Sequence, residues 1–132
     1  MKQKKILVIE DAPELADALR DLLTMKQYQT LVERSGQKGL DVALAEHPDL
    51  ILLDLRLPDI DGFEVLRQLR QDSWGMSANV LILTAADTSE AIPEGIDLPR
   101  EKILQKWQWG IENIASRIEA ELLNTDTSSH RL

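Results

Sequence analysis

Short runs of consecutive apolar residues alternate along this chain with longer stretches that have the periodicity of helices. The runs at 6–9 (ILVI), 50–53 (LILL) and 80–83 (VLIL) are apolar at every position. A strand of this kind is covered on both faces, as in a parallel sheet between two layers of helices. The half-polar run Thr30–Glu33 and the very short run Ile103–Gln105 are expected at the sheet edges. The pattern therefore predicts an α/β fold built from parallel βα units.

Apolar stripes with helical spacing predict helices around residues 15–23, 40–44, 63–70 and 111–122. Asp11 is the predicted N-cap of the first helix, with Pro13 in its first turn, and Asp61 is the predicted cap of the third. The second helix is expected to end near His47, because the residue before Pro48 is pushed out of helical geometry.

The stretch between the apolar runs 80–83 and 103–105 predicts only a weak helix. Asp87–Glu90 has a capping pattern that can start one, but Pro93, Gly95 and Pro99 leave little continuous length. We expect a single short turn followed by loop, so that the fourth helix is short or broken.

Length and charge limit the class of protein. The 132 residues suffice for one domain with a real core, which we place at 1–123, followed by a polar tail or linker stump at 124–132. Within the tail, Thr125–Leu132 lacks periodicity and is expected to be frayed. With 15 basic and 23 acidic residues the net charge is −8, which argues against direct nucleic-acid binding.

No membrane or export signal stands out. No apolar run approaches the roughly 18 residues of a membrane span. Residues 1–5 (MKQKK) lead directly into the short apolar run 6–9, without the apolar core of a signal peptide. The absence of cysteine excludes disulfides and thiolate metal sites. A cytoplasmic location is expected.

Polar residues stand where the apolar runs stop. The run 6–9 is followed by Glu10 and Asp11, and the run 50–53 by Asp54. Thr84 follows the run 80–83, and Lys106 follows the run 103–105. In an open parallel sheet the carboxyl ends of all strands lie on one edge, where ligands bind. The sequence thus predicts three carboxylates, a hydroxyl and an ammonium along a single edge.

Three neighbouring carboxylates need either raised pKa values or a cation. Oxygen ligands without His or Cys suit Mg²⁺ or Mn²⁺, which keeps open positions for a phosphoryl oxygen. An aspartate beside it can attack phosphorus, while Lys106 and Thr84 supply a positive charge and a hydroxyl donor to the phosphoryl group. These are the parts of a phosphoryl-accepting site.

Over residues 4–123 the chain resembles the receiver domain of two-component response regulators, of the kind found in chemotaxis regulators. The resemblance rests on Lys5–Asp11 (KILVIED), Asp54–Gly62 (DLRLPDIDG), Leu83–Ala85 (LTA) and Lys106, and on their spacing. It implies a flavodoxin-like, doubly wound five-stranded parallel sheet in the order 2-1-3-4-5, with helices on both faces.

The resemblance also implies the roles of the site residues. Asp54 would accept a phosphoryl group from a sensor histidine kinase or a histidine phosphotransfer protein, and Thr84 and Lys106 would contact the phosphoryl oxygens. The implied Mg²⁺ ligands are Glu10, Asp11, Asp54 and the carbonyl of Arg56. Phosphorylation would switch binding of a downstream protein, with a homodimer left open and no external substrate turned over.

The chain departs from the family pattern in three places. Trp107 stands where a proline usually follows the lysine, so we expect a trans peptide bond there. Ile103 stands where a tyrosine or phenylalanine usually swings inward, and the fourth helix is weak. The hypothesis is that phosphoryl chemistry is kept while the usual output route is weakened or rerouted. Trp107 and Trp109 either anchor a partner or, as we favour, pack on the core and the neighbouring loop.

Two other classes of function stay open. A metal-dependent phosphatase with an aspartyl nucleophile usually has a second acid two residues later, where this chain has Arg56. A degenerate receiver that only binds proteins would take no phosphoryl group from acetyl phosphate.

Overall fold

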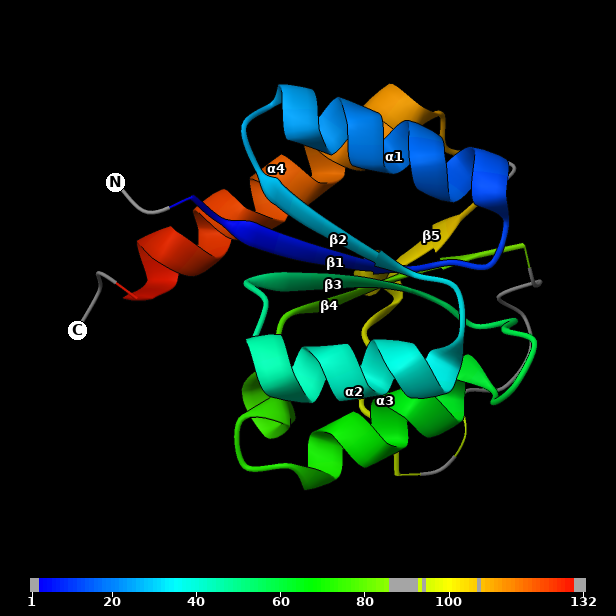
Figure 1. Cartoon of the computed structure of the whole chain (residues 1–132). Coiled ribbons are helices and arrows are strands. Elements are labelled where there is room, and N and C mark those ends of the chain that lie inside the picture. Colours follow the sequence, from blue (N-terminus) through cyan, green and yellow to red (C-terminus); the bar gives the residue numbers. More distant parts are fainter. Residues whose placement is uncertain (1–2, 86–92, 94, 107, 130–132) are drawn as a thin grey trace.

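A single parallel sheet organises the chain (Figure 1). The computed structural model describes residues 3–85, 93, 95–106 and 108–129, and of 125–129 the backbone only. The strands are β1 (Lys5–Ile9), β2 (Gln29–Glu33), β3 (Leu50–Asp54), β4 (Val80–Thr84) and β5 (Ile103–Gln105). Their order is β2-β1-β3-β4-β5 and all neighbouring pairs are parallel. The predicted strand order and the two predicted edge strands are confirmed.

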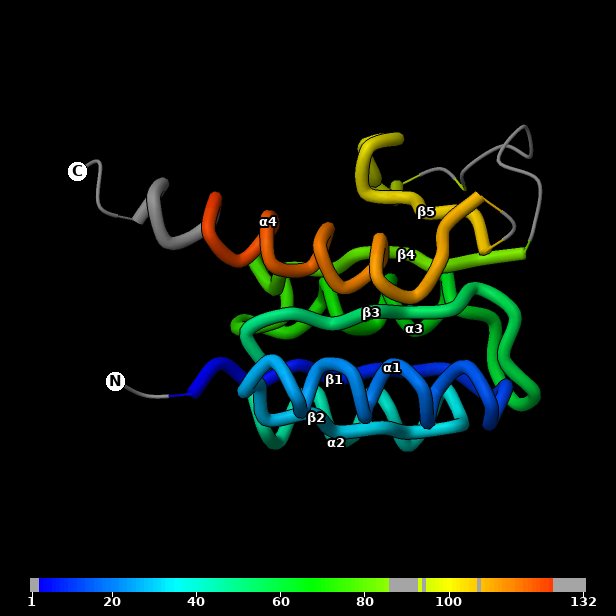
Figure 2. The backbone as a smooth tube through the Cα atoms, turned by 90° about the horizontal axis from the view of Figure 1, so that it is seen from above, coloured from blue at the N-terminus to red at the C-terminus, as the bar shows by residue number. Residues whose placement is uncertain are grey.

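Helices cover both faces of the sheet. They are α1 (Pro13–Met25), α2 (Gly36–Glu46), α3 (Gly62–Gln71) and α4 (Ile111–Ser129), with short 3-10 helices η1 (Gly75–Ser77) and η2 (Arg100–Lys102). α1 and α4 lie on one face and α2 and α3 on the other (Figures 1 and 2). Among the described residues, no helix has both the length and the apolar character that crossing a membrane requires.

The core has two halves, one on each face of the sheet. In β1, Ile6 and Val8 pack beneath α1 and α4, whereas Leu7 and Ile9 pack beneath α2 and α3. All four are at most 1% exposed. Because both faces of the strand are covered, every position has to be apolar, which is the pattern that predicted the parallel sheet.

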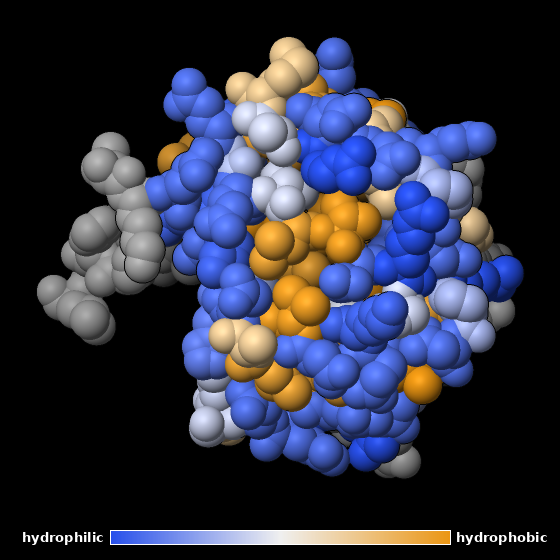
Figure 3. Space-filling model, in the orientation of Figure 1, coloured by the Kyte–Doolittle hydropathy of each residue, from blue (hydrophilic) through white to orange (hydrophobic). Residues whose placement is uncertain are grey.

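The edge strand β2 is less covered than the central strands. Its residues from Thr30 to Glu33 are half-buried, and Gln29 is exposed. Apolar surface is visible between α1 and α2, where β2 runs, with hydrophilic residues around it (Figure 3). The half-polar sequence of β2 therefore fits its place at the edge.

Between β4 and β5 none of the described residues is α-helical. Gly95 has a positive φ of 87°, and η2 precedes β5 directly. The predicted turn at 87–90 lies outside the described residues. The described part agrees with a fourth helix that is short or broken.

The end of α2 follows the prediction. The helix ends at Glu46, and His47 has left-handed backbone geometry with φ 48°. The His47 ring stacks on Trp74, with the centroids 4.4 Å apart and the planes 7° from parallel. This contact joins the end of α2 to the loop after α3. The predicted cap at Asp61 is also confirmed, since its side chain accepts a hydrogen bond from Phe63 N at 2.8 Å.

Two predictions about helix ends are wrong. The N-cap of α1 is Ala12, without a side-chain hydrogen bond, rather than Asp11. Glu10 Oε2 accepts the Ala12 N–H at 3.0 Å, while the exposed Asp11 side chain contributes to an acidic cluster. The Asp11 carboxylate lies with those of Glu10 and Asp54 and does not cap α1.

The second error concerns residues 125–129 of the tail predicted to be frayed, whereas 130–132 lie outside the described residues. The backbone of α4 stays helical through Ser129, although the sequence from Asn124 onward is polar. Once an amphipathic helix has formed, adding a residue costs only its small intrinsic propensity. The division into a domain at 1–123 and a linker at 124–132 stays a prediction.

Candidate functional site

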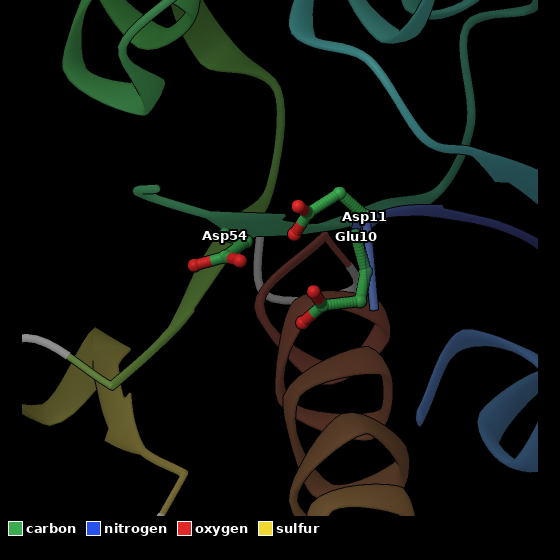
Figure 4. Close-up of side chains that lie close together, drawn as sticks. All are labelled: Glu10, Asp11 and Asp54. Atoms are coloured by element: carbon green, nitrogen blue, oxygen red, sulfur yellow. The ribbon is translucent and has the colours of Figure 1, made fainter. Parts of the chain in front are cut away.

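The acidic residues predicted at the sheet edge lie together. Glu10 and Asp11 directly follow β1, and Asp54 is the last residue of the neighbouring β3. Each offers a carboxylate oxygen, and these oxygens all lie within 4.8 Å of one another (Figure 4). Glu10 and Asp54 are buried, at 1% and 3% exposure, while Asp11 is exposed. The cluster therefore has a buried floor and one side open to solvent.

Lys106 completes this edge from the other side. It follows β5 directly, and its backbone N–H donates to the Thr84 carbonyl at 2.8 Å, continuing the ladder between β4 and β5. Its Nζ donates to Asp54 Oδ2 at 3.1 Å. The same Nζ forms an ion pair with Glu10 Oε1 at 2.7 Å, without the directionality of a hydrogen bond. The lysine thus points into the cluster and links carboxylates from two strands.

Burial and neighbouring charges shift the pKa values of Glu10 and Lys106. Burial raises the pKa of Glu10 and the charge of Asp54 adds to this, although Lys106 and the Ala12 N–H act in the opposite direction. Burial lowers the pKa of Lys106, but its ion pairs with Glu10 and Asp54 outweigh burial, and the pKa is raised overall. The ammonium is therefore held in its charged form beside a carboxyl that resists ionisation.

The β3–α3 loop turns back tightly from Asp54. Arg56 N donates to Asp54 Oδ1 at 3.1 Å, so the Arg56 peptide lies next to this carboxylate. Gly62 N donates to the Leu55 carbonyl at 2.9 Å. A Cβ on Gly62 would lie 2.5 Å from the Asp54 carbonyl oxygen, so glycine is needed here because the two backbones approach closely.

Thr84 ends β4, next to β3 in the sheet. It is 1% exposed and follows Leu83, which pairs with Asp54 in the sheet register. Of the residues predicted for the site, the carboxylates of Glu10, Asp11 and Asp54 lie together, and Lys106 forms ion pairs with two of them. Thr84 and Arg56 lie beside them, since the Thr84 carbonyl accepts from Lys106 N and Arg56 N donates to the Asp54 carboxylate.

The donor set fits a hard divalent cation. Three carboxylates supply oxygen only, and their crowding is relieved by positive charge. Buried Glu10 Oε1 accepts no well-directed hydrogen bond from the described residues, and the exposed Asp11 leaves room for water ligands. Mg²⁺ prefers such a mixture of carboxylate, carbonyl and water.

The departures from the family pattern have mixed outcomes. Ile103 is half-buried and packs on the core beneath α2 and α3. Trp109 packs against the core beneath α1 and α4, as favoured. The predicted trans bond before Trp107 and the packing of Trp107 lie outside the described residues. Although Trp107 follows it in place of proline, Lys106 directs its Nζ at Glu10 and Asp54.

Asp59 had no predicted role. Its carboxylate accepts two backbone N–H groups at the start of α2, Gly36 N at 2.7 Å and Gln37 N at 2.9 Å. These bonds, that of Gln37 foremost, lower the pKa of Asp59. The partners are 23 and 22 residues away in the chain, so no local pattern in the sequence reveals them.

Comparison with known proteins agrees with this geometry. Residues 6–119 match the family model of the response regulator receiver domain. The chain is 36% identical over 122 residues to the DNA-binding dual master transcriptional regulator RpaA of Synechocystis sp., covering 92% of this chain and 50% of that protein. It is 40% identical over 119 residues to the response regulator ArlR of Staphylococcus aureus, covering 89% of this chain and 52% of that protein.

Solved structures share the fold. A CheY-like response regulator receiver domain protein from Methanospirillum hungatei superposes with a TM-score of 0.78 at 17% identity, covering 96% of this chain and 99% of that chain. The chain spans about half the length of the two curated relatives. With the family model matching most of its length, this chain belongs to the response regulator receiver domains of two-component signalling.

Proposed function

We propose that this chain accepts a phosphoryl group on Asp54 and that the modified form binds a downstream protein differently. The observation that carries the proposal is the contact of Lys106 Nζ with both Asp54 and Glu10, inside a cluster of three carboxylate residues. The Lys106 ammonium is one positive centre that can stabilise a phosphoryl group, and a cation bound by the acidic cluster would be the second.

In the proposed reaction an Asp54 carboxylate oxygen attacks phosphorus. The bond from phosphorus to a histidine nitrogen of the donor breaks, the nitrogen keeps the electron pair and takes up a proton, and Asp54 becomes an acyl phosphate. Lys106 would turn from the Asp54 carboxylate to the new phosphoryl oxygens, and Thr84 would donate its hydroxyl to them. Mg²⁺, when bound, supplies positive charge to the phosphoryl oxygens.

Glu10, Asp11 and Asp54, with the Arg56 carbonyl, are the residues we propose to hold this cation. Mn²⁺ is expected to replace Mg²⁺, since both accept the same oxygen ligands. Glu10 would do so as the ionised carboxylate, and a bound cation would offset the burial that raises its pKa.

A sensor histidine kinase or a histidine phosphotransfer protein is the proposed donor, as the family implies. DNA binding belongs to the name of the relative RpaA. For this chain, with its net charge of −8, we propose no direct contact with nucleic acid. Homodimer formation and a cytoplasmic location stay predictions.

Intact-mass measurement after incubation with acetyl phosphate and Mg²⁺ tests the proposal. The native chain should gain the mass of one phosphoryl group, and Asp54→Asn should gain none. Asp72→Asn, at the far end of α3, is the matched control and should gain the group as the native chain does. If the native chain stays unmodified, the protein-binding module is the better function. Turnover of a small phosphoester would instead favour the phosphatase.

The switching half of the proposal has its own test. Phosphorylation adds a doubly charged group, which shifts the chain only if two states contact it differently. Because Ile103 replaces the usual aromatic residue, we expect beryllofluoride with Mg²⁺ to shift NMR signals around Asp54, Thr84 and Lys106 and to change those of 86–102 little. A large shift across 86–102 would contradict a weakened output route.

A further inference from the structure

The β3–α3 loop, residues 55–61, is held at three places. At its start Arg56 N donates to Asp54 Oδ1, and at its end Gly62 N donates to the Leu55 carbonyl. Its outer turn is held by the two hydrogen bonds from the start of α2 to Asp59. Figure 1 shows this loop, between β3 and α3, beside the end of α2 at which the chain enters that helix.

The hydrogen bonds to Asp59 are short and involve both oxygens. Oδ1 accepts from Gly36 N at 2.7 Å and Oδ2 from Gln37 N at 2.9 Å. Both N–H groups belong to the first turn of α2, where no intrahelical partner is available. The local cap of α2, Ser35, accepts from a different group, Lys38 N, at 3.3 Å. Asp59 therefore adds a link between two elements to a helix that already has its own cap.

Packing strengthens this link. A Cβ on Gly36 would lie 2.6 Å from Ile60 Cγ1 and 2.9 Å from Val65 Cγ2. Gly36 is buried, so Ile60, next to Asp59, rests directly on the first residue of α2. The loop and the helix start therefore form one contact surface, made by Asp59 on one side and by Ile60 on the other.

The position of this surface matters for the proposed metal site. A backbone carbonyl such as that of Arg56 can bind a cation only where the loop holds it, because it has no side-chain freedom to adjust. Groups that orient a ligand without touching the metal typically change affinity by about 10- to 100-fold when removed. Asp59 is three positions after Arg56 and fixes the part of the loop that Asp54 does not.

We propose that Asp59 is a positioning residue of the phosphoryl-accepting site, which ties the β3–α3 loop to the start of α2 and thereby places the Arg56 carbonyl for the cation. This inference rests on the proposed function. It makes the start of α2, whose residues contribute no ligand, a determinant of cation affinity.

Asp59→Ala is the test variant and Asp72→Ala the matched control. Asp72 Oδ2 also accepts two backbone N–H groups, Trp74 N at 3.0 Å and Gly75 N at 2.9 Å, at the far end of α3. Titration calorimetry of the full chain with MgCl₂ should show roughly tenfold weaker binding for Asp59→Ala, and native binding for Asp72→Ala. Asp59→Asn keeps one oxygen acceptor and should lie between Asp59→Ala and the native chain.

Amide hydrogen exchange and urea unfolding separate positioning from stability. In Asp59→Ala the Gly36 and Gln37 amides should exchange faster, and the loss of stability should resemble that of Asp72→Ala. Faster exchange with unchanged Mg²⁺ affinity would overturn the inference, and so would equal weakening by Asp72→Ala. If Asp59→Ala does not fold, the affinity of Asp59→Asn decides in the same way. Native chain that binds no Mg²⁺ and gains no phosphate would overturn the proposed function as well.

Discussion

Lys106 Nζ lies 2.7 Å from Glu10 Oε1, although the two residues belong to opposite ends of the chain. The same Nζ donates to Asp54 Oδ2 at 3.1 Å. The side chains of Glu10 and Asp54 are 2% and 3% exposed, and that of Lys106 is 23% exposed. One cation from the end of β5 thus neutralises carboxylates from the ends of β1 and β3.

The first prediction concerns this lysine. Lys106→Met keeps an unbranched, flexible side chain but removes the charge that would stabilise the transferred phosphoryl group. Phosphoryl uptake from acetyl phosphate should slow about 100-fold, followed by intact mass over time. Mg²⁺ should bind at least as tightly as in the native chain, because a neighbouring positive charge is gone.

Lys5→Met is the control for this prediction. Lys5 forms an ion pair with Glu46 at 3.3 Å at the opposite edge of the sheet, where the strands begin. Its removal should leave the uptake rate unchanged. Equal rates for Lys106→Met and Lys5→Met would contradict the role of Lys106.

The second prediction is a pH dependence. Burial raises the pKa of Glu10 above the ordinary glutamate value of 4.5, so the folded chain holds this proton more tightly than the unfolded chain. The resulting stability is fully present below about pH 4.5 and is lost as the pH rises through the raised pKa. In metal-free buffer, Glu10→Gln should therefore gain stability relative to the native chain as the pH increases. Urea unfolding at several pH values measures this difference.

Glu64→Gln should give the opposite trend. The hydrogen bond from Arg67, followed by that from Gln68, lowers the pKa of Glu64 below the ordinary glutamate value of 4.5. Its contribution is present above that value and is lost as the pH falls through the lowered pKa. Parallel curves for Glu10→Gln and Glu64→Gln would show that the sign derived for Glu10 is wrong.

The third prediction tests the close approach at Gly62. A Cβ there would lie 2.5 Å from both the Asp54 carbonyl oxygen and Leu55 Cα, which are backbone atoms. Gly62→Ala should therefore displace Asp54 and reduce phosphoryl uptake as well as stability. At Gly110, by contrast, nothing lies within 4 Å of an added Cβ. Gly110→Ala should keep native uptake by intact mass, and a Gly62→Ala chain with native uptake would contradict the prediction.

The fourth prediction concerns stability far from the site. Glu121 on α4 is buried and pairs with Lys102 of η2 and with Arg117, the latter at 2.9 Å. Glu121→Ala leaves two part-buried cations without this carboxylate and should cost about 2–3 kcal/mol in urea unfolding. Glu46→Ala removes an exposed ion pair with Lys5 and should cost less than about 1 kcal/mol. Similar losses for both variants would contradict a special role for the buried carboxylate.

Much of the fold is readable from the sequence because burial decides which positions of each strand and helix are apolar. Strands 6–9, 50–53 and 80–83 are apolar throughout since they are covered on both faces. The edge position of Thr30–Glu33 follows from its polar half. The polar residues of the candidate site are equally readable, because the strand ends of a parallel sheet share one edge.

Helix ends were less predictable. Asp11 has the right residue type for an N-cap, yet its carboxylate lies with those of Glu10 and Asp54. The polar sequence after Leu123 argued for a frayed end, yet α4 continues through Ser129. Local propensities differ by less than about 1 kcal/mol per residue, so tertiary contacts and helix propagation override them.

By itself, then, the sequence determined the parallel α/β architecture and the set of polar residues at the sheet edge, because periodic burial and strand ends are local properties of the chain. Only the tertiary structure decided that Lys106 points at Glu10 and Asp54, and that Asp59 holds the start of α2. These contacts join residues that are far apart in sequence, and their energies depend on distance and burial in the folded chain, which no local pattern encodes.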